Sequence, residues 1–199
     1  MDPSERDTRS DAYAHRLLAR ESRWKRRLHL QAPFGWYLRR LDLGATLDVG
    51  CGFGRNLVHL GPRGVGVDHN PTVVAAARAR GLEAWEVDAF WRSPRAQPGS
   101  FDALLFAHVL EHLAKAEASA LVGRYLPLLR SQGRVVLITP QEAGQRADPS
   151  HLTFLDFAAL GALLAEHGLV PERRSSFPLP RPFGRVLRYN EFVVVGRRP

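Results

Sequence analysis

The stretch LDVGCGFGRN at residues 47–56 decides the fold. An apolar run leads into Asp48, glycines alternate at positions 50, 52 and 54, and a helical pattern follows. This order predicts a strand, a tight turn and the start of a helix, because glycine has no Cβ and adopts positive φ readily. Such a turn lets a ligand approach the backbone closely. The Asp48 carboxylate would repel a phosphate, so the sequence favours a cationic or hydroxylated ligand over a nucleotide phosphate.

The composition is that of one globular domain. The chain has 199 residues, of which 45% are hydrophobic and 24% are charged, which is enough for a full core. Cys51 is the only cysteine, so we expect no internal disulfide and a reducing, cytoplasmic setting. No apolar run is long enough for a transmembrane helix, and the charged first residues do not resemble a signal peptide. The sequence therefore predicts a chain without a membrane partner.

The net charge of +8 raises the question of nucleic acid as a partner. Lys25 and Lys115 are the only lysines, and the arginines are spread along the chain. We therefore interpret most of them as solvated surface residues, which counts against a nucleic-acid footprint. A local exception is the basic cluster of residues 20–27 around Trp24.

Apolar runs and helical spacings alternate along the chain, which predicts an α/β fold with a doubly wound sheet. The expected strands cover residues 45–50, 64–68, 83–88, 101–107, 134–139, 169–175 and 189–196. The expected helices cover residues 10–28, 34–41, 54–60, 71–80, 115–129 and 154–167. Only a proline-rich loop, residues 177–188, joins the last two strands. We therefore expect a seven-stranded, mostly parallel sheet whose last strand is antiparallel.

Acidic residues follow or end the first three expected strands. Asp68 ends the second strand and can accept both hydroxyls of a ribose, and Asp88 ends the third and can accept the amino group of an adenine. Phe90 would form an apolar wall beside that base. The carboxyl ends of parallel strands meet at one edge of the sheet, where ligands bind. Together with Asp48, these acids predict a nucleoside site, since unpartnered buried acids are costly.

On these residues, the chain from about 40 to 199 resembles the class I S-adenosylmethionine (SAM)-dependent methyltransferases. Within them it looks like the bacterial small-molecule methyltransferases related to those of ubiquinone synthesis. The matching segments are 47–56, 64–70, 87–90, 101–113 and 129–140. A dinucleotide-binding dehydrogenase is the competing interpretation, but its G-x-G-x-x-G fingerprint follows an apolar strand without an acid.

The resemblance implies a Rossmann-like methyltransferase fold with SAM as the cofactor. It assigns Asp48 and the three glycines to the methionine part, Asp68 to the ribose, and Asp88 with Ala89 to the adenine. Cys51 would be a backbone spacer. The whole expected cofactor set is Asp48, Gly50, Cys51, Gly52, Gly54, Asn56, Asp68, His69, Asn70, Asp88, Ala89, Phe90, Ala107 and His108.

A histidine-rich segment follows the fourth expected strand. If it opens a helix, His108, Glu111 and His112 share one face, and His151 from the loop after the fifth strand can join them. This set could bind a divalent metal such as Mg, Mn or Zn. It is similar to the Glu-x-x-Glu-His site of small-RNA 2′-O-methyltransferases, although His108 stands where those have Glu. In metal-free relatives, Glu111 would instead be structural and His112 would face the acceptor.

These residues favour O-methylation of a small hydroxylated metabolite, a saccharide or a phenol. A hydroxyl needs a base or a metal to become a nucleophile, so the expected catalytic residues are His112, His151 and Glu111. Residues 1–41 are expected to form a helical extension that caps the acceptor, and residues 42–199 the SAM-binding domain. An RNA-directed methyltransferase and a non-catalytic SAM-binding regulatory module remain alternatives. We expect a monomer or a homodimer.

Overall fold

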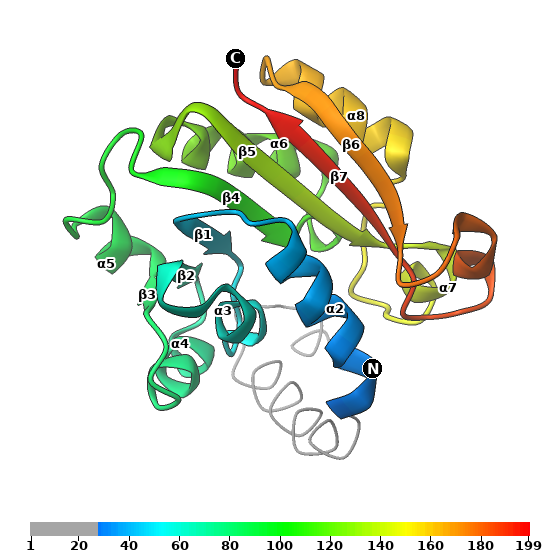
Figure 1. The fold of residues 1–199 in the computed structure, drawn as a ribbon, viewed down its shortest axis with the longest axis horizontal. Coiled ribbons are helices and arrows are strands. Elements are labelled where there is room, and N and C mark those ends of the chain that lie inside the picture. The colour runs from blue at the N-terminus through cyan, green and yellow to red at the C-terminus, as the bar shows by residue number, and fades with distance from the viewer. Residues whose placement is uncertain (1–27) are drawn as a thin grey trace.

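The computed structural model describes residues 28–199 (Figure 1). The charged first residues, nearly all of the helix expected over 10–28, and the basic cluster around Trp24 lie outside this part. Seven strands form one sheet in the order β3-β2-β1-β4-β5-β7-β6. The strands are β1 (Thr46–Val49), β2 (Gly64–Asp68), β3 (Ala84–Glu86), β4 (Phe101–Ala107), β5 (Leu129–Pro140), β6 (Val170–Phe177) and β7 (Glu191–Arg197).

Helices cover both faces of the sheet, with α2 on one face and α6 and α8 on the other (Figure 1). The α-helices are α2 (Leu28–Arg40), α3 (Arg55–Leu60), α4 (Pro71–Arg78), α5 (Val87–Trp91), α6 (Lys115–Tyr125), α7 (Glu142–Gln145) and α8 (Phe157–Glu166). Short 3-10 helices are η3 (Gly61–Arg63), η4 (Leu110–His112), η5 (Leu126–Leu128) and η6 (Arg181–Arg185). Within residues 28–199, no helix is both long and apolar enough to span a bilayer.

The core follows the two-residue period of the strands. In β4, Leu104 and Phe106 are fully buried in the cluster that contains Val122 of α6, whereas Leu105 lies in the cluster around Tyr37 of α2. A strand covered on both faces is apolar throughout, which is why 64–68 and 101–107 were predicted with their observed bounds.

The antiparallel last strand is confirmed. β7 pairs antiparallel with both β5 and β6, while β1, β2, β3, β4 and β5 pair in parallel. β7 is therefore the strand that brings its first residue, Glu191, to the edge where β4 and β5 end. The sheet is seven-stranded and mostly parallel, with a reversed last strand, as the sequence predicts.

Several predicted boundaries are wrong. The helix expected over 34–41 begins at Leu28, as α2. The strand expected over 83–88 ends at Glu86, and Asp88 lies in the first turn of α5, where a helix N-terminus favours a negative charge. The helix expected over 115–129 ends at Tyr125, and β5 begins at Leu129. Residues 131–133, which the sequence analysis interpreted as a helix stop, form an irregularity inside β5, where Gln132 has a φ of 61°. The register of β4 against β5 shifts there between Phe101 and Ala103.

Candidate functional site

The glycine turn after β1 has one glycine that faces open space. Gly50, Gly52 and Gly54 all have positive φ, at 78°, 52° and 76°. A Cβ on Gly50 would come within 2.8 Å of Val109, and one on Gly54 within 2.5 Å of Leu82, so both glycines are needed for packing. A Cβ on Gly52 would meet no other atom within 4 Å. The turn is therefore closely packed on both sides of Gly52 and open at Gly52.

Asp48 is a fully buried acid with one oxygen left without a partner. Its Oδ1 accepts a hydrogen bond from Asn56 Nδ2 at 3.3 Å, and its Oδ2 has no partner. Burial raises the pKa of Asp48 to about 7, against the lowering effect of the Asn56 hydrogen bond and the charge of Arg55. Such an oxygen is costly unless a donor reaches it, which fits a cationic or N–H-bearing ligand.

Asp68, at the end of β2, is held by the backbone around it. Gly52 N–H donates to its Oδ2 at 2.9 Å and Asn70 N–H to its Oδ1 at 2.9 Å. Asn70 caps α4 by accepting from Thr72 N–H, and the exposed His69 lies 3.7 Å from Asp68. The carboxylate thus joins the end of β2 to the glycine turn.

The other expected cofactor residues are divided between the edge and the core. Asp88 is exposed in α5 and Ala89 is half-buried beside it. Phe90 is fully buried and its ring packs near Phe101 and Tyr125, so the structure places it in the core and not as an exposed wall.

Cys51 and Ala107 are buried next to the site. Burial raises the pKa of the Cys51 thiol well above its usual range, as do the charges of Asp48 and Asp68, which suits a spacer rather than a nucleophile. Ala107 is the buried last residue of β4.

His108 does not open a helix. It has a φ of 58° and precedes the short η4, so the helical face expected for His108, Glu111 and His112 does not form. Instead its ring lies between two carboxylates, with Nε2 at 2.8 Å from Glu191 and Nδ1 at 3.3 Å from Glu111. Burial would lower the pKa of His108, but Glu191 and Glu111 outweigh it and raise the pKa to about 10.

Glu191 is a site residue that the sequence analysis missed. It is the first residue of β7, and its Oε1 contacts His108 while its Oε2 is buried without a partner. Its position depends on the reversed direction of β7. The sequence does show a carboxylate near the start of the strand that is predicted to be antiparallel. It does not show that this carboxylate pairs with His108.

Glu111, His112 and His151 do come together. One ligand atom of each lies within 4.8 Å of the others, and the two imidazole rings are 4.9 Å apart. Nδ1 of His112 lies 3.1 Å from Ser150 O, and Nδ1 of His151 lies 3.3 Å from Gln145 O. Since a carbonyl only accepts, Nδ1 carries the proton in both rings.

Burial also prepares this group for a ligand. Glu111 is fully buried, and its Oε2 has no partner. Burial would raise the pKa of Glu111, but the hydrogen bond and charge of His108 hold it below its usual range. Burial lowers the pKa of His151, as does His112. One ionised carboxylate and a neutral imidazole are forms that bind a metal. The structure does not bring His108 into this group.

The aromatic residues of α2, β6 and η6 differ in exposure. Tyr37 is buried, with its hydroxyl 2.6 Å from Ser175 Oγ and its ring 4.6 Å from that of Phe177. Trp36 and Phe183 are exposed. The structure therefore uses Tyr37 and Phe177 for packing.

Comparison with known proteins gives a consistent result. A family described as "Methyltransferase domain" matches residues 47–137. The ubiquinone biosynthesis O-methyltransferase of Xanthomonas oryzae pv. oryzae is 34% identical over 110 residues, which are 50% of this chain and 45% of that protein. That of Xanthomonas campestris pv. campestris is 32% identical over 102 residues, 47% of this chain and 42% of that protein. The chain thus spans about half the length of these relatives.

Solved structures share the fold at low identity. A putative methyltransferase from Haloferax volcanii, solved in complex with the Trm112 methyltransferase activator, has a TM-score of 0.71 at 20% identity and covers 95% of this chain and 97% of its own. Magnesium protoporphyrin IX methyltransferase from Synechocystis, solved with bound SAH, has a TM-score of 0.60 at 18% identity, with coverage of 82% and 79%.

Proposed function

We propose that the chain is a class I SAM-dependent methyltransferase that transfers a methyl group from SAM to a hydroxyl of a small molecule, assisted by a divalent metal ion. The observation that carries this proposal is the open backbone at Gly52, between the unpartnered carboxylate oxygen of Asp48 and the anchored carboxylate of Asp68. A ligand with an ammonium group and a ribose would meet both acids there.

Each residue then has a positioning role. Asp48 Oδ2 binds the α-ammonium group of SAM, Gly52 gives room for its methionine part, and Asp68 binds the ribose hydroxyls. Asp88 and Ala89 bind the adenine from the first turn of α5. When bound, SAM supplies a methyl group activated by its sulfonium. Holding that methyl in line with the acceptor oxygen is the protein's main contribution to the rate.

The group formed by Glu111, His112 and His151 fits a divalent metal. Two imidazole nitrogens and one carboxylate oxygen leave open coordination positions, and this donor set suits Zn or Mn better than Mg. The unpartnered Oε2 of Glu111 gains a ligand in this arrangement. A metal ion held there would lower the pKa of a coordinated hydroxyl, whose proton would then leave to solvent. With no metal bound, the free Nε2 of His112 or His151 would be the group that accepts the proton.

We infer which part of the chain covers the methyl acceptor from the elements that pack near the carboxyl edge of the sheet. We assign residues 1–41 to the cover over the acceptor and residues 42–199 to the SAM-binding domain. In support, α2 packs through Tyr37 against Phe177, which is paired with Glu191 at the carboxyl edge. A small hydroxylated metabolite, a phenol or a saccharide, is the acceptor class. The O-methyltransferase relatives support oxygen as the atom that is methylated.

Gly52→Ala should weaken SAM binding by about tenfold or more, because its Cβ would enter the open space at the turn. Isothermal titration calorimetry with SAM measures this. Gly81→Ala is the matched control, since Gly81 also has positive φ and a Cβ there meets no atom within 4 Å. Both variants should lose about 1 kcal/mol of stability. Equal SAM affinity in the two variants would contradict the proposal that SAM binds at Gly52.

His151→Ala should weaken Co²⁺ or Zn²⁺ binding by about tenfold to a hundredfold or more, since one of three protein ligands is lost. The d–d absorption of bound Co²⁺ reports the coordination directly. Methyl transfer from labelled SAM to a panel of phenols and saccharides should stop with a chelator and return with metal. His167→Ala is the control, because His167 follows the last residue of α8 and its ring lies 3.1 Å from Ser119 Oγ. Full activity with a chelator present would exclude the metal but not SAM-dependent transfer.

A further inference from the structure

The segment between β6 and β7, residues 178–190, has an unusual composition, and we call it the strap. Its sequence is PLPRPFGRVLRYN, with three arginines and no acidic residue. It contains η6 and projects from the body of the molecule beside α7 (Figure 1). Nothing in the proposed methyl transfer uses its outer side.

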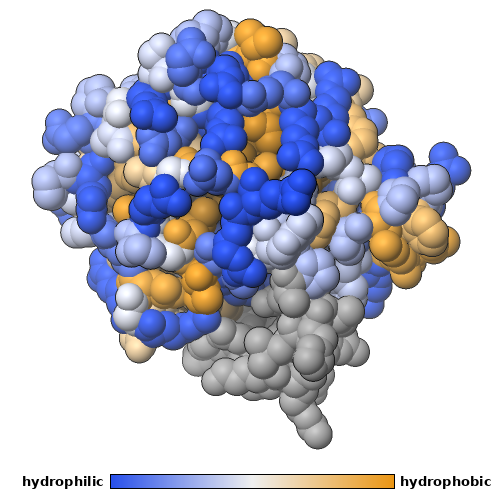
Figure 2. Space-filling view, viewed as in Figure 1, coloured by the Kyte–Doolittle hydropathy of each residue, from blue (hydrophilic) through white to orange (hydrophobic). Residues whose placement is uncertain are grey.

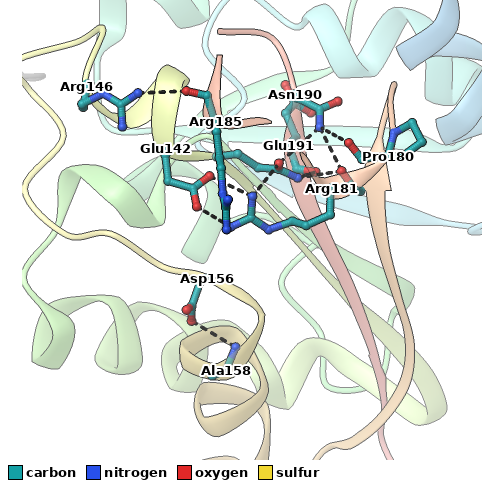
Figure 3. Close-up of polar contacts among 11 residues, drawn as sticks. Glu142, Arg146, Asp156, Ala158, Pro180, Arg181, Arg185, Asn190 and Glu191 are labelled. Atoms are coloured by element: carbon teal, nitrogen blue, oxygen red, sulfur yellow. Dashed lines mark hydrogen bonds and ion pairs between the residues drawn. The ribbon is translucent and has the colours of Figure 1, made fainter. Parts of the chain in front are cut away.

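Two polar side chains of the strap, those of Asn190 and Arg181, bind the body of the molecule. Asn190 is 1% exposed, donates to Gln141 Oε1 and Ser176 Oγ, and accepts from Leu179 N–H. Arg181 forms an ion pair with both carboxylate oxygens of Glu142 (Figure 3). A Cβ on Gly184 would overlap the Gln141 side chain. These contacts fix the strap to α7 and the end of β5.

The strap turns its apolar side chains outward. Half of the ten large hydrophobic residues that are exposed in residues 33–199 lie on it, and they are Leu179, Phe183, Val186, Leu187 and Tyr189. Val186 is the most exposed of them, at 73%. Figure 2 shows hydrophobic residues gathered where the strap projects. A segment held by a buried polar network while its apolar side faces water marks an interaction surface.

The charge of the strap indicates what kind of partner binds this surface. Arg185 and Arg188 are exposed on the strap, and Arg146 beside it is exposed and donates to Arg185 O. The nearby Glu142 is already paired with Arg181. A second copy of the chain would bring the same arginines together across a two-fold axis, and each copy carries a net charge of +8. The occupant must therefore be apolar and anionic.

We propose that the strap docks on an anionic lipid surface. Val186, Leu187 and Phe183 enter the boundary between headgroups and acyl chains, and Arg185 and Arg188 bind lipid phosphates. The sequence predicts no membrane partner, because no apolar run in it is long enough to span a bilayer. A surface contact of this kind needs no spanning helix and is independent of the proposed methyl transfer.

The test uses the full chain with phosphatidylcholine vesicles, with and without phosphatidylglycerol. The protein should sediment with the anionic vesicles and not with the neutral ones. Val186→Asp with Leu187→Asp should abolish the binding, and Arg185→Gln with Arg188→Gln should weaken it by roughly tenfold. Val58→Asp and Val170→Asp are controls, since both residues are exposed but lie on α3 and β6. Thermal melting and SAM binding show that each variant is folded.

Two outcomes would overturn the proposal. The first is no binding to anionic vesicles, or binding that the strap variants leave unchanged. The second is self-association that Val186→Asp with Leu187→Asp abolishes in light scattering, which would assign the surface to a second copy.

Discussion

Asp48→Asn should weaken SAM binding by about tenfold to a hundredfold and remove its pH dependence. The loss corresponds to one charge-assisted hydrogen bond, about 1.5–3 kcal/mol. In the unchanged protein the pKa of Asp48 is about 7, so SAM affinity should fall as the pH drops below 7 and the carboxylate is protonated. The asparagine variant should bind SAM with nearly constant affinity from pH 6 to 8. Calorimetry across this range measures both effects.

The same variant should be more stable without ligand. The folded pKa of Asp48 is raised from 3.8, so its contribution to stability is present below that value and is lost as the pH rises through about 7. Asparagine resembles the protonated acid. The free energy of unfolding of Asp48→Asn should therefore equal that of the unchanged protein near pH 4 and exceed it by about 2–4 kcal/mol at pH 8. Urea unfolding without SAM measures this.

Asp102→Asn is the matched control for Asp48→Asn. Asp102 accepts from Ala45 N–H and pairs with Arg130 at the opposite edge of the sheet. This variant should keep its SAM affinity and lose stability at neutral pH. An Asp48→Asn protein that binds SAM as the unchanged protein does would contradict the assignment of Asp48 to the ammonium group.

His108→Leu should destabilise the metal-free protein by about 2–4 kcal/mol at neutral pH. The substitution leaves the Glu111 and Glu191 carboxylates facing each other without the cation between them. This loss of stability is smaller than that expected for a fully buried ion pair, because about a third (32%) of the His108 side chain is exposed. Urea unfolding in the presence of a chelator measures the loss.

Two further variants separate charge from backbone strain. Glu191→Gln added to His108→Leu should regain part of the stability, about 1–2 kcal/mol, because it removes one unpaired charge. Gln132→Leu is the control for the backbone, since Gln132 has a φ of 61°, close to the 58° of His108, but belongs to no ion pair in the described structure. If Gln132→Leu lowers the free energy of unfolding as much as His108→Leu does, the ion pairs of His108 contribute little to stability.

The sheet could be predicted because its signals are local. Buried runs such as 103–107 are apolar throughout, and Pro71 stands at the first position of α4, where its missing N–H costs nothing. The missing helix between the last two expected strands was enough to predict the reversal of β7, which the pairing confirms.

Predictions from local sequence failed where the same sequence pattern is compatible with two different local conformations. Ser131 to Gly133 looks like a helix stop, but the same residues serve as an irregularity in β5. The segment after β4 has helical spacing, yet His108 adopts a left-handed conformation because its ring pairs with Glu191 on β7. That pairing joins residues far apart in the chain, and the register of β5 against β7 that creates it cannot be read from either segment alone.

The reversal of β7 sets which part of the chain lies beside Glu191 at the carboxyl edge of the sheet. In a parallel strand Arg197, the last residue of β7, would stand at that edge instead. Because β7 runs the other way, an internal loop closes over the edge and is held at both ends. Insertions in this loop can reshape the surface at that edge without disturbing the half of the sheet where β1, β2 and β3 lie.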